Sequence, residues 1–202
     1  MLKIGITGGM GSGKTTASQV FRSLGIPVYN SDERARFFME TEQTVRNDVI
    51  NLLGNSAYMH DRLNREYIAN RVFNDNHLLN HLNGIIHPIV ANDAKEWESN
   101  QIDVPFTLRE AALLYESGGY LSLDAVILVK APLELRIYRI MNRDRVTRDQ
   151  IVKRLRFQWP DKMKEQLSDY TVLNDGKRML IPQLVSLYKQ LLLENSELLQ
   201  YQ

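Results

Sequence analysis

The sequence predicts an α/β fold in which a doubly wound, five-stranded parallel sheet lies between two layers of helices. Short apolar runs alternate with amphipathic helical stretches along the chain. A glycine-rich turn follows the first apolar run, and the run at 125–129 is β-rich and apolar on both faces, as a central parallel strand requires. With right-handed crossovers, these observations give a three-layer α/β/α sandwich. We expect strands at 2–7, 26–29, 104–108, 125–129 and 170–173.

The glycine-rich turn at residues 8–16 is the most specific motif. It reads Gly-Gly-Met-Gly-Ser-Gly-Lys-Thr-Thr and contains G-x-x-x-x-G-K-[ST] in full. Glycines let the backbone fold tightly and turn successive N–H groups onto a phosphate. Lys14 can reach the β- and γ-phosphates, and Thr15 offers a hydroxyl to Mg²⁺ where the next helix points its positive end at the same anions. The strand at 2–7 and the amphipathic helix at 15–24 supply the context of a P-loop NTPase.

Length and composition narrow the classes of function. A chain of 202 residues can bury one substantial core with an inserted or lid region. A net charge of +1 provides no strong electrostatic attraction to nucleic acid or to an anionic membrane, so a small-molecule partner is favoured. The absence of cysteine excludes disulfides, thiolate zinc sites and cysteine nucleophiles. Because no leader pattern or membrane-length apolar run is present, we expect a cytoplasmic protein. We also expect a monomer or a weak homo-oligomer.

Two carboxylates follow predicted strands at their carboxyl ends, where open α/β sheets place their chemistry. Asp32 follows the strand at 26–29. It either caps the next helix or orients an acceptor hydroxyl and accepts its proton, and the phosphate loop favours the second role. Glu110 follows the strand at 104–108. It either lies near the water shell of Mg²⁺ or forms an ion pair with Arg109 or another arginine.

Residues 41–99 predict helices near 42–53, 65–73, 76–86 and 88–99, with a polar turn at 58–64 and no strand. Such a helical insertion between sheet strands is the usual position of an acceptor-binding region. His87 precedes Pro88, so we expect it at an extended helix boundary, with either a packing or a functional role.

The stretch after 125–129 is rich in arginine. Five arginines occur within 13 residues, and guanidinium groups bind phosphate oxygens bidentately, so we expect at least one of them to act in the reaction. The alternative for most of them is a solvated basic face. Thr147 and Gln150 form a capping-box pattern that starts a helix to about 158. The arginines before this helix, together with the helix itself, predict a mobile lid that closes over phosphates and excludes water. The arginines are Arg136, Arg139, Arg143, Arg145 and Arg148.

From residue 2 to residue 176 the chain resembles the dephospho-coenzyme A kinases, relatives of the nucleoside monophosphate kinases. The resemblance includes the phosphate loop, 30–36 where the family has D-x-D-x-x-A-R, the boundary at 87–90 and Leu-Leu-Tyr-Glu at 113–116. It continues through 135–139, Gln158, Asp169 and the turn at 174–176. Two positions depart from the family pattern: Asn30 replaces the first acid, and Ala112 replaces a proline.

The resemblance implies transfer of the γ-phosphoryl group of ATP, with Mg²⁺, to the ribose 3′-hydroxyl of dephospho-coenzyme A. It implies a single kinase domain with core 1–40, 100–142 and 168–202, an acceptor region at about 41–99 and a lid at about 143–165. The implied catalytic residues are Asp32, Lys14 and Arg139. ATP would contact Gly9, Met10, Gly11, Ser12, Gly13, Lys14, Thr15, Thr16, Asn174 and Gly176. The acceptor would contact Asp32, Arg36, His87 and Glu116, with Mg²⁺ at Thr15 and near Glu110 through water.

Three other classes remain open at this point. Another small-molecule kinase of the same fold would use the same loop, Asp32 and arginines. A regulatory GTPase-like switch should carry D-x-x-G and N-K-x-D, and neither string occurs in the sequence. An inactive nucleotide-binding module is disfavoured because Lys14, Thr15 and Asp32 are all present.

Overall fold

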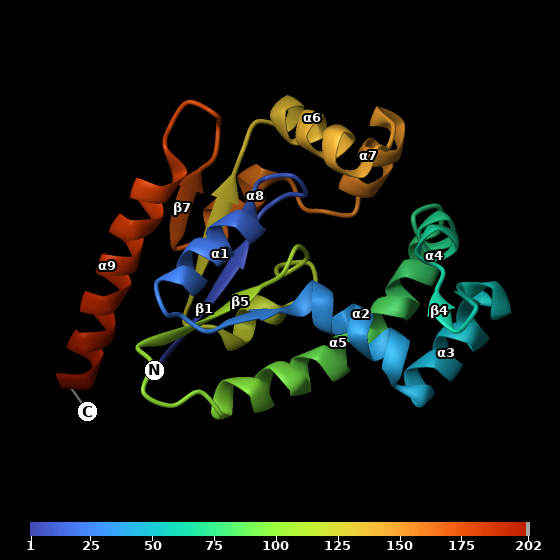
Figure 1. Cartoon of the computed structure of the whole chain (residues 1–202), viewed down its shortest axis with the longest axis horizontal. Helices are drawn as coiled ribbons and strands as arrows, with labels where there is room; N and C mark the ends of the chain where they lie inside the picture. Colours follow the sequence, from blue (N-terminus) through green and yellow to red (C-terminus); the bar gives the residue numbers. More distant parts are fainter. Residues whose placement is uncertain (201–202) are drawn as a thin grey trace. The chain divides into compact units, whose positions relative to one another are not determined.

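A computed structural model describes residues 1–200 of the chain (Figure 1). The chain divides into two compact units. We call Met1–Asn30 with Trp97–Gln202 the phosphate-loop unit and Ser31–Glu96 the helical unit. The helical unit begins earlier than the expected acceptor region at about 41, because the helix after the second strand belongs to it. The organisation as one kinase domain stays a prediction.

The phosphate-loop unit is built on a five-stranded sheet in the order β2-β5-β1-β6-β7. Every neighbouring pair is parallel, which confirms the predicted sheet. Strand β1 lies at the centre, with β5 and β2 on one side of it and β6 and β7 on the other. The carboxyl end of β1 is therefore the topological switch point, where such sheets bind ligands. The strands are β1 Leu2–Thr7, β2 Val28–Asn30, β5 Phe106–Glu110, β6 Ala125–Lys130 and β7 Tyr170–Leu173.

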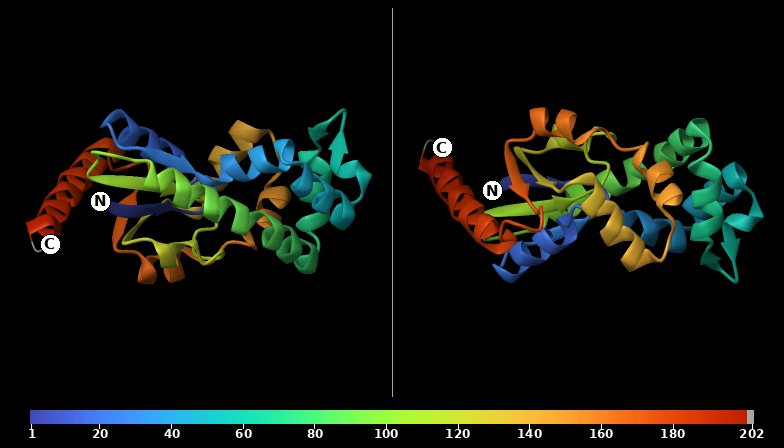
Figure 2. Two further views of the ribbon diagram at one scale, coloured as in Figure 1. Left: turned by 90° about the horizontal axis from the view of Figure 1, so that it is seen from below. Right: turned by 90° about the horizontal axis from the view of Figure 1, so that it is seen from above.

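Helices cover both faces of this sheet, and Figure 2 shows α1 and α8 on opposite sides of it. On one face, α1 Lys14–Ser23 and α9 Leu180–Gln200 bury apolar side chains against the strands. On the other, α8 Asp161–Leu167 lies near a cluster around Tyr115 and Trp159. A Cβ on Gly5 would lie 2.7 Å from side-chain carbons of Leu114 and Leu123, so this second layer depends on glycine in β1.

Two further helices follow β6. They are α6 Leu133–Asp144 and α7 Arg148–Leu155, and they pack together through Ile137, Ile140 and Ile151. The predicted capping box is present: Thr147 Oγ1 accepts the Gln150 N–H, and Gln150 Oε1 accepts the Thr147 N–H. Helix α7 ends before the expected 158, and the chain then turns into α8. A 3₁₀ turn at Gly119–Ser122 was not predicted.

The helical unit corrects one expectation about Pro88. Helix α5, Asn76–Ser99, continues through this proline without interruption, so His87 lies inside a helix and not at an extended boundary. The buried side chains of Leu82, Ile86 and Val90 continue at intervals of one helical turn on both sides of Pro88. Their packing holds the helix together where the proline removes one hydrogen bond. The other helices are α2 Ser31–Thr41, α3 Gln43–Leu53 and α4 Arg65–Val72.

The expectation of no strand in this region is also wrong. After the 3₁₀ turn Asn55–Ala57, strands β3 Tyr58–Met59 and β4 Arg62–Leu63 pair antiparallel. Between them, His60 and Asp61 have φ values of 50° and 62°. Positive φ at both central residues gives a tight hairpin turn that is usually signalled by Asn-Gly, and His-Asp lacks that signal. Among residues 1–200, no helix is long and apolar enough to span a membrane.

Candidate active site

The phosphate loop connects β1 to α1, and its shape depends on glycine. Gly11 and Gly13 have φ values of 80° and 96°, which L-residues rarely adopt. A Cβ on Gly13 would also lie 2.2 Å from the amide nitrogen of Asn174. The Ser12 N–H donates to the Gly9 carbonyl at 2.9 Å, which closes the turn before Lys14 begins α1. The loop therefore delivers Lys14 and Thr15 at the positive end of a helix, as the motif predicts.

Glu110 lies beside these two residues. The Thr15 hydroxyl donates to Glu110 Oε1 at 2.6 Å, and Lys14 Nζ lies 3.8 Å from the same oxygen. Glu110 is 2% exposed at the end of β5, so its charge is compensated by these neighbours inside the protein. Arg109, the alternative partner weighed from the sequence, points elsewhere and forms its ion pair with Glu98 at 2.5 Å.

The donor set fits magnesium. Thr15 and Glu110 place a hydroxyl and a carboxylate oxygen next to each other, and Mg²⁺ prefers oxygen ligands. Within the described residues, no group of three or more His, Cys, Asp or Glu side chains could hold a metal ion by itself. Magnesium typically uses one or two protein ligands together with substrate phosphates and water.

Asn174 and Arg139 brace the loop from outside. Asn174 Nδ2 donates to the Ser12 carbonyl at 2.8 Å. Arg139 donates to the Asn174 carbonyl at 3.2 Å and to the Gly11 carbonyl at 3.5 Å. The structure thus brings Asn174 and Arg139, which were both expected to contact ATP, into contact with the phosphate loop. Beyond them, Gly176 turns the chain with a φ of 79°. A phosphate contact by Arg139 stays a prediction.

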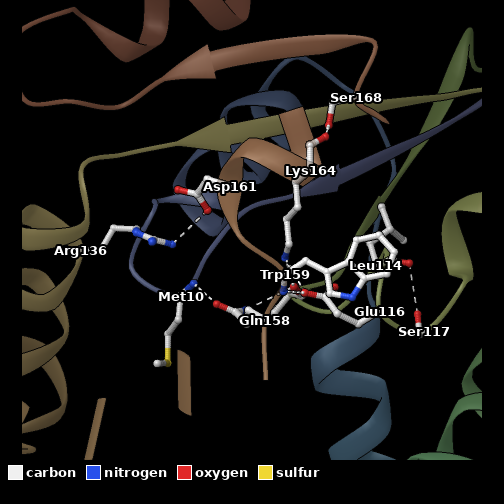
Figure 3. Close-up of polar contacts among 11 residues, drawn as sticks. Met10, Leu114, Glu116, Ser117, Arg136, Gln158, Trp159, Asp161, Lys164 and Ser168 are labelled. Carbon is white, nitrogen blue, oxygen red and sulfur yellow. Dashed lines mark hydrogen bonds and ion pairs between the residues drawn. The ribbon is translucent and has the colours of Figure 1, made fainter. Parts of the chain in front are cut away.

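Figure 3 shows a second set of contacts, on the segment between α7 and α8. Gln158 Oε1 accepts the Met10 N–H at 2.8 Å, and its amide nitrogen donates to the Ala112 carbonyl at 3.3 Å. Gln158 is one of the positions that resemble the family, and no role was expected for it. Its hydrogen bonds tie the phosphate loop to the segment between α7 and α8 and to the chain that follows β5.

Glu116, expected on the acceptor side, has partners inside the phosphate-loop unit. Its Oε1 accepts the Trp159 N–H at 2.7 Å and lies 2.8 Å from Lys164 Nζ (Figure 3). The Lys164 side chain is 0% exposed, so this ion pair is buried. Lys164 was missed from the sequence because a lysine in a short polar helix is usually exposed. An acceptor contact by Glu116 stays a prediction.

Three expected acceptor residues belong to the helical unit. Asp32 lies in the first turn of α2, where the helix dipole favours a carboxylate. Arg36 is exposed and donates to the Asp32 carbonyl oxygen at 3.1 Å. Burial lowers the pKa of His87, and the negative charge of Asp32 acts on that pKa in the opposite direction. Asp32 and His87 are therefore electrostatic neighbours, although α2 and α5 are far apart in sequence.

Comparisons with known proteins identify the family of the chain. A family model described as dephospho-CoA kinase (CoaE) matches residues 2–179. The dephospho-CoA kinase of Bacteroides fragilis is 37% identical over 186 residues, which cover 92% of this chain and 91% of the relative. The crystal structure of TT1252 from Thermus thermophilus superposes with a TM-score of 0.81 at 31% identity, covering 94% and 96% of the two chains.

A dephospho-CoA kinase from Campylobacter jejuni shares the fold, with a TM-score of 0.67 at 22% identity and coverage of 96% of this chain and 98% of that one. The family match spans most of the sequence and includes the phosphate loop, β5 with Glu110 and the turn at Asn174. The chain therefore belongs to the dephospho-CoA kinase family.

Proposed function

We propose that this protein transfers the γ-phosphoryl group of ATP to the ribose 3′-hydroxyl of dephospho-CoA, giving CoA and ADP in the last step of CoA biosynthesis. The family assignment supports the reaction. The observation that carries it at the level of residues is the contact between Thr15 and the buried Glu110 at the phosphate loop. This contact, with Lys14 beside it, supports a site in which Thr15 and Glu110 would hold the metal and Lys14 the phosphates of a nucleoside triphosphate.

The phosphate-loop unit would hold the donor. The N–H groups of the loop and the amino end of α1 bind the phosphate chain, and Lys14 neutralises its β- and γ-oxygens. Thr15 and Glu110 would hold Mg²⁺, with Glu110 acting directly or through water. Bound magnesium would supply charge neutralisation and in-line alignment of the phosphates. Arg139, already beside Gly11, would add a guanidinium to the same anion.

Asp32 would act on the acceptor. Its carboxylate accepts the proton of the 3′-hydroxyl while the hydroxyl oxygen forms a bond to the γ-phosphorus. The bond from that phosphorus to the bridging oxygen breaks, and ADP leaves with the negative charge. Because Asn30 replaces the acid two positions earlier, Asp32 is the single carboxylate in this D-x-D position that can serve as base. Burial lowers the pKa of His87 and so favours the neutral imidazole, which can donate or accept a hydrogen bond toward the acceptor.

A coupled ADP-release assay with ATP and Mg²⁺ tests the proposal. Dephospho-CoA is compared with adenosine, AMP and a panel of small alcohols, and the product is identified as CoA by mass. We expect release with dephospho-CoA only. Release with another acceptor would assign the chain to a different small-molecule kinase activity on the same fold, and no release with any acceptor would contradict the kinase proposal.

A further inference from the structure

Arg136 is the most unusual buried charge in the phosphate-loop unit. It lies in the first turn of α6, and its side chain is 9% exposed. A guanidinium carries five N–H donors, and buried charges are normally satisfied by close partners. Within the described residues, Nε of Arg136 is buried without a hydrogen-bond partner, and NH1 lies a long 3.4 Å from Asp161 Oδ1. Arg136 therefore has fewer hydrogen-bond partners among the described residues than its five donors could use.

The guanidinium lies directly against the phosphate loop. A Cβ on Gly9 would lie 1.4 Å from NH1 and 2.7 Å from Cζ of Arg136, so glycine at this position is what admits the guanidinium. The Arg136 carbonyl approaches the loop as well, 2.7 Å from a Cβ built on Gly11. Figure 3 shows Arg136 reaching from α6 toward Asp161, with Met10 of the loop beside it. The loop and α6 are thus fitted to each other around this one cation.

The position of Arg136 beside the phosphate loop would allow its guanidinium to bind a nucleotide phosphate. A bound nucleotide brings several phosphate oxygens, and arginine binds such oxygens through its planar fork. Asp161 is 20% exposed, so its carboxylate can be solvated when Arg136 changes partner. A contact of 3.4 Å to a partly exposed carboxylate is weak compared with a charge-assisted hydrogen bond to phosphate.

We propose that Arg136 is a ligand of the phosphate chain of the bound nucleotide, and that Asp161 holds its guanidinium beside Gly9 until a phosphate oxygen replaces the carboxylate. The inference rests on the proposed function only in that the nucleotide is ATP. It assigns a substrate contact to Arg136 in addition to the role expected for Arg139. Asp161 is a positioning residue in this scheme.

Nucleotide affinity, measured calorimetrically with Mg²⁺ and without acceptor, tests the assignment. Arg136→Met should weaken binding about 10- to 100-fold, the effect of losing hydrogen bonds to a charged group. Asp161→Asn should bind as tightly as the wild type or more tightly, because the competing carboxylate is gone. If Arg136→Met loses affinity for ATP but not for ADP, Arg136 binds the γ-phosphate. If it loses affinity for both nucleotides, Arg136 binds the α- or β-phosphate. Arg22→Met, which removes an exposed arginine of α1, is the matched control and should bind normally.

A purely structural ion pair predicts the opposite pattern, in which Arg136→Met and Asp161→Asn lower the melting temperature and the affinity together. That result, or unchanged affinity for both nucleotides in Arg136→Met, would overturn the proposal. If Arg136→Met does not fold, Arg136→Lys keeps the charge without the fork and should bind with an intermediate loss; wild-type affinity in it would likewise overturn the assignment. Since no acceptor is present, failure of the wild type to phosphorylate dephospho-CoA would not affect this result.

Discussion

The two units of the molecule hold their functional groups in different ways. In the phosphate-loop unit, side chains from distant parts of the chain converge on one loop: Glu110 on Thr15, Gln158 on Met10, and Asn174 on Ser12. In the helical unit, Asp32 and His87 are carried by helices that pack on each other, with Arg34 and Asp93 forming a bidentate pair between α2 and α5.

The difference predicts two kinds of failure. The loop has several independent braces, so changes there should mainly alter how the nucleotide is held. In the helical unit, Asp32 is expected to act as the general base and not to bind the nucleotide, so changes at Asp32 should mainly alter turnover. Separating binding from turnover in point variants tests whether this division is real.

Lys14→Ala should have the largest effect. The variant loses the cation that neutralises the phosphates, so kcat/KM should fall by roughly 10³–10⁵-fold, the range for losing a cation on a transferring phosphoryl group. Weaker ATP binding and slower turnover should both contribute, as steady-state kinetics and calorimetry together can show. If ATP binding and turnover both survived, our interpretation of the loop would be wrong.

Asp32→Asn should separate the two kinds of failure most sharply. ATP affinity should stay near the wild-type value while kcat falls by about 10²–10⁴-fold, as expected when a general base is lost. Glu33→Gln changes the neighbouring exposed carboxylate of the same helical turn and should leave kcat nearly unchanged. Unchanged turnover in Asp32→Asn would remove Asp32 from the catalytic residues.

Lys164→Met should test the buried ion pair through stability. Removing Lys164 leaves the Glu116 carboxylate buried, so the free energy of unfolding should fall by about 3–5 kcal/mol, and the double variant with Glu116→Gln should recover most of it. Lys130→Met breaks a pair of the same 2.8 Å length with Glu165 at the surface and should cost about 1 kcal/mol or less. Equal losses in denaturant unfolding would show that burial does not distinguish the two pairs.

Gln158→Leu should have a moderate effect on the nucleotide. The Met10 N–H loses its acceptor, and an unsatisfied donor costs about 1–3 kcal/mol, so KM for ATP should rise by roughly 10-fold. Gln183→Leu is the matched control, because Gln183 makes similar hydrogen bonds to the backbone of Leu173, at the end of β7. It should lower stability without changing KM. A rise in KM in both variants would point to general loosening of the unit.

The sequence predicted the loop and the sheet well because both depend on local rules. Gly11, Gly13, Lys14 and Thr15 define a backbone shape and a charge that need no distant partner. The long-range braces were not predictable in the same way. Gln158 is part of the family resemblance, but nothing in its local sequence indicates its hydrogen bond to the phosphate loop. Nothing local distinguishes Lys164 from the usual solvated lysine until folding brings it beside Glu116.

The errors in the helical unit have the same cause. Pro88 is a helix breaker in isolation, and only packing by residues such as Ile86 and Val90 shows that α5 continues through it. The turn at His60 and Asp61 adopts a tight hairpin without the residues that usually signal one. In both places tertiary contacts override a correct local rule.

The pH dependence of stability should show the smallest effect and should report on Asp32 and His87 together. Because burial lowers the pKa of folded His87 below its ordinary value of 6.5, the unfolded chain binds more protons between these two values. Stability should therefore fall as the pH drops below about 6.5 toward the folded pKa, and His87→Gln should lose this component in melting curves between pH 5 and 8. Asp32→Asn removes the charge that raises the His87 pKa, so its stability should fall more steeply in the same window. If the stability of Asp32→Asn changed with pH as steeply as that of the wild type, Asp32 and His87 would not be coupled. Helix α2 would then have no electrostatic link to α5 at this position.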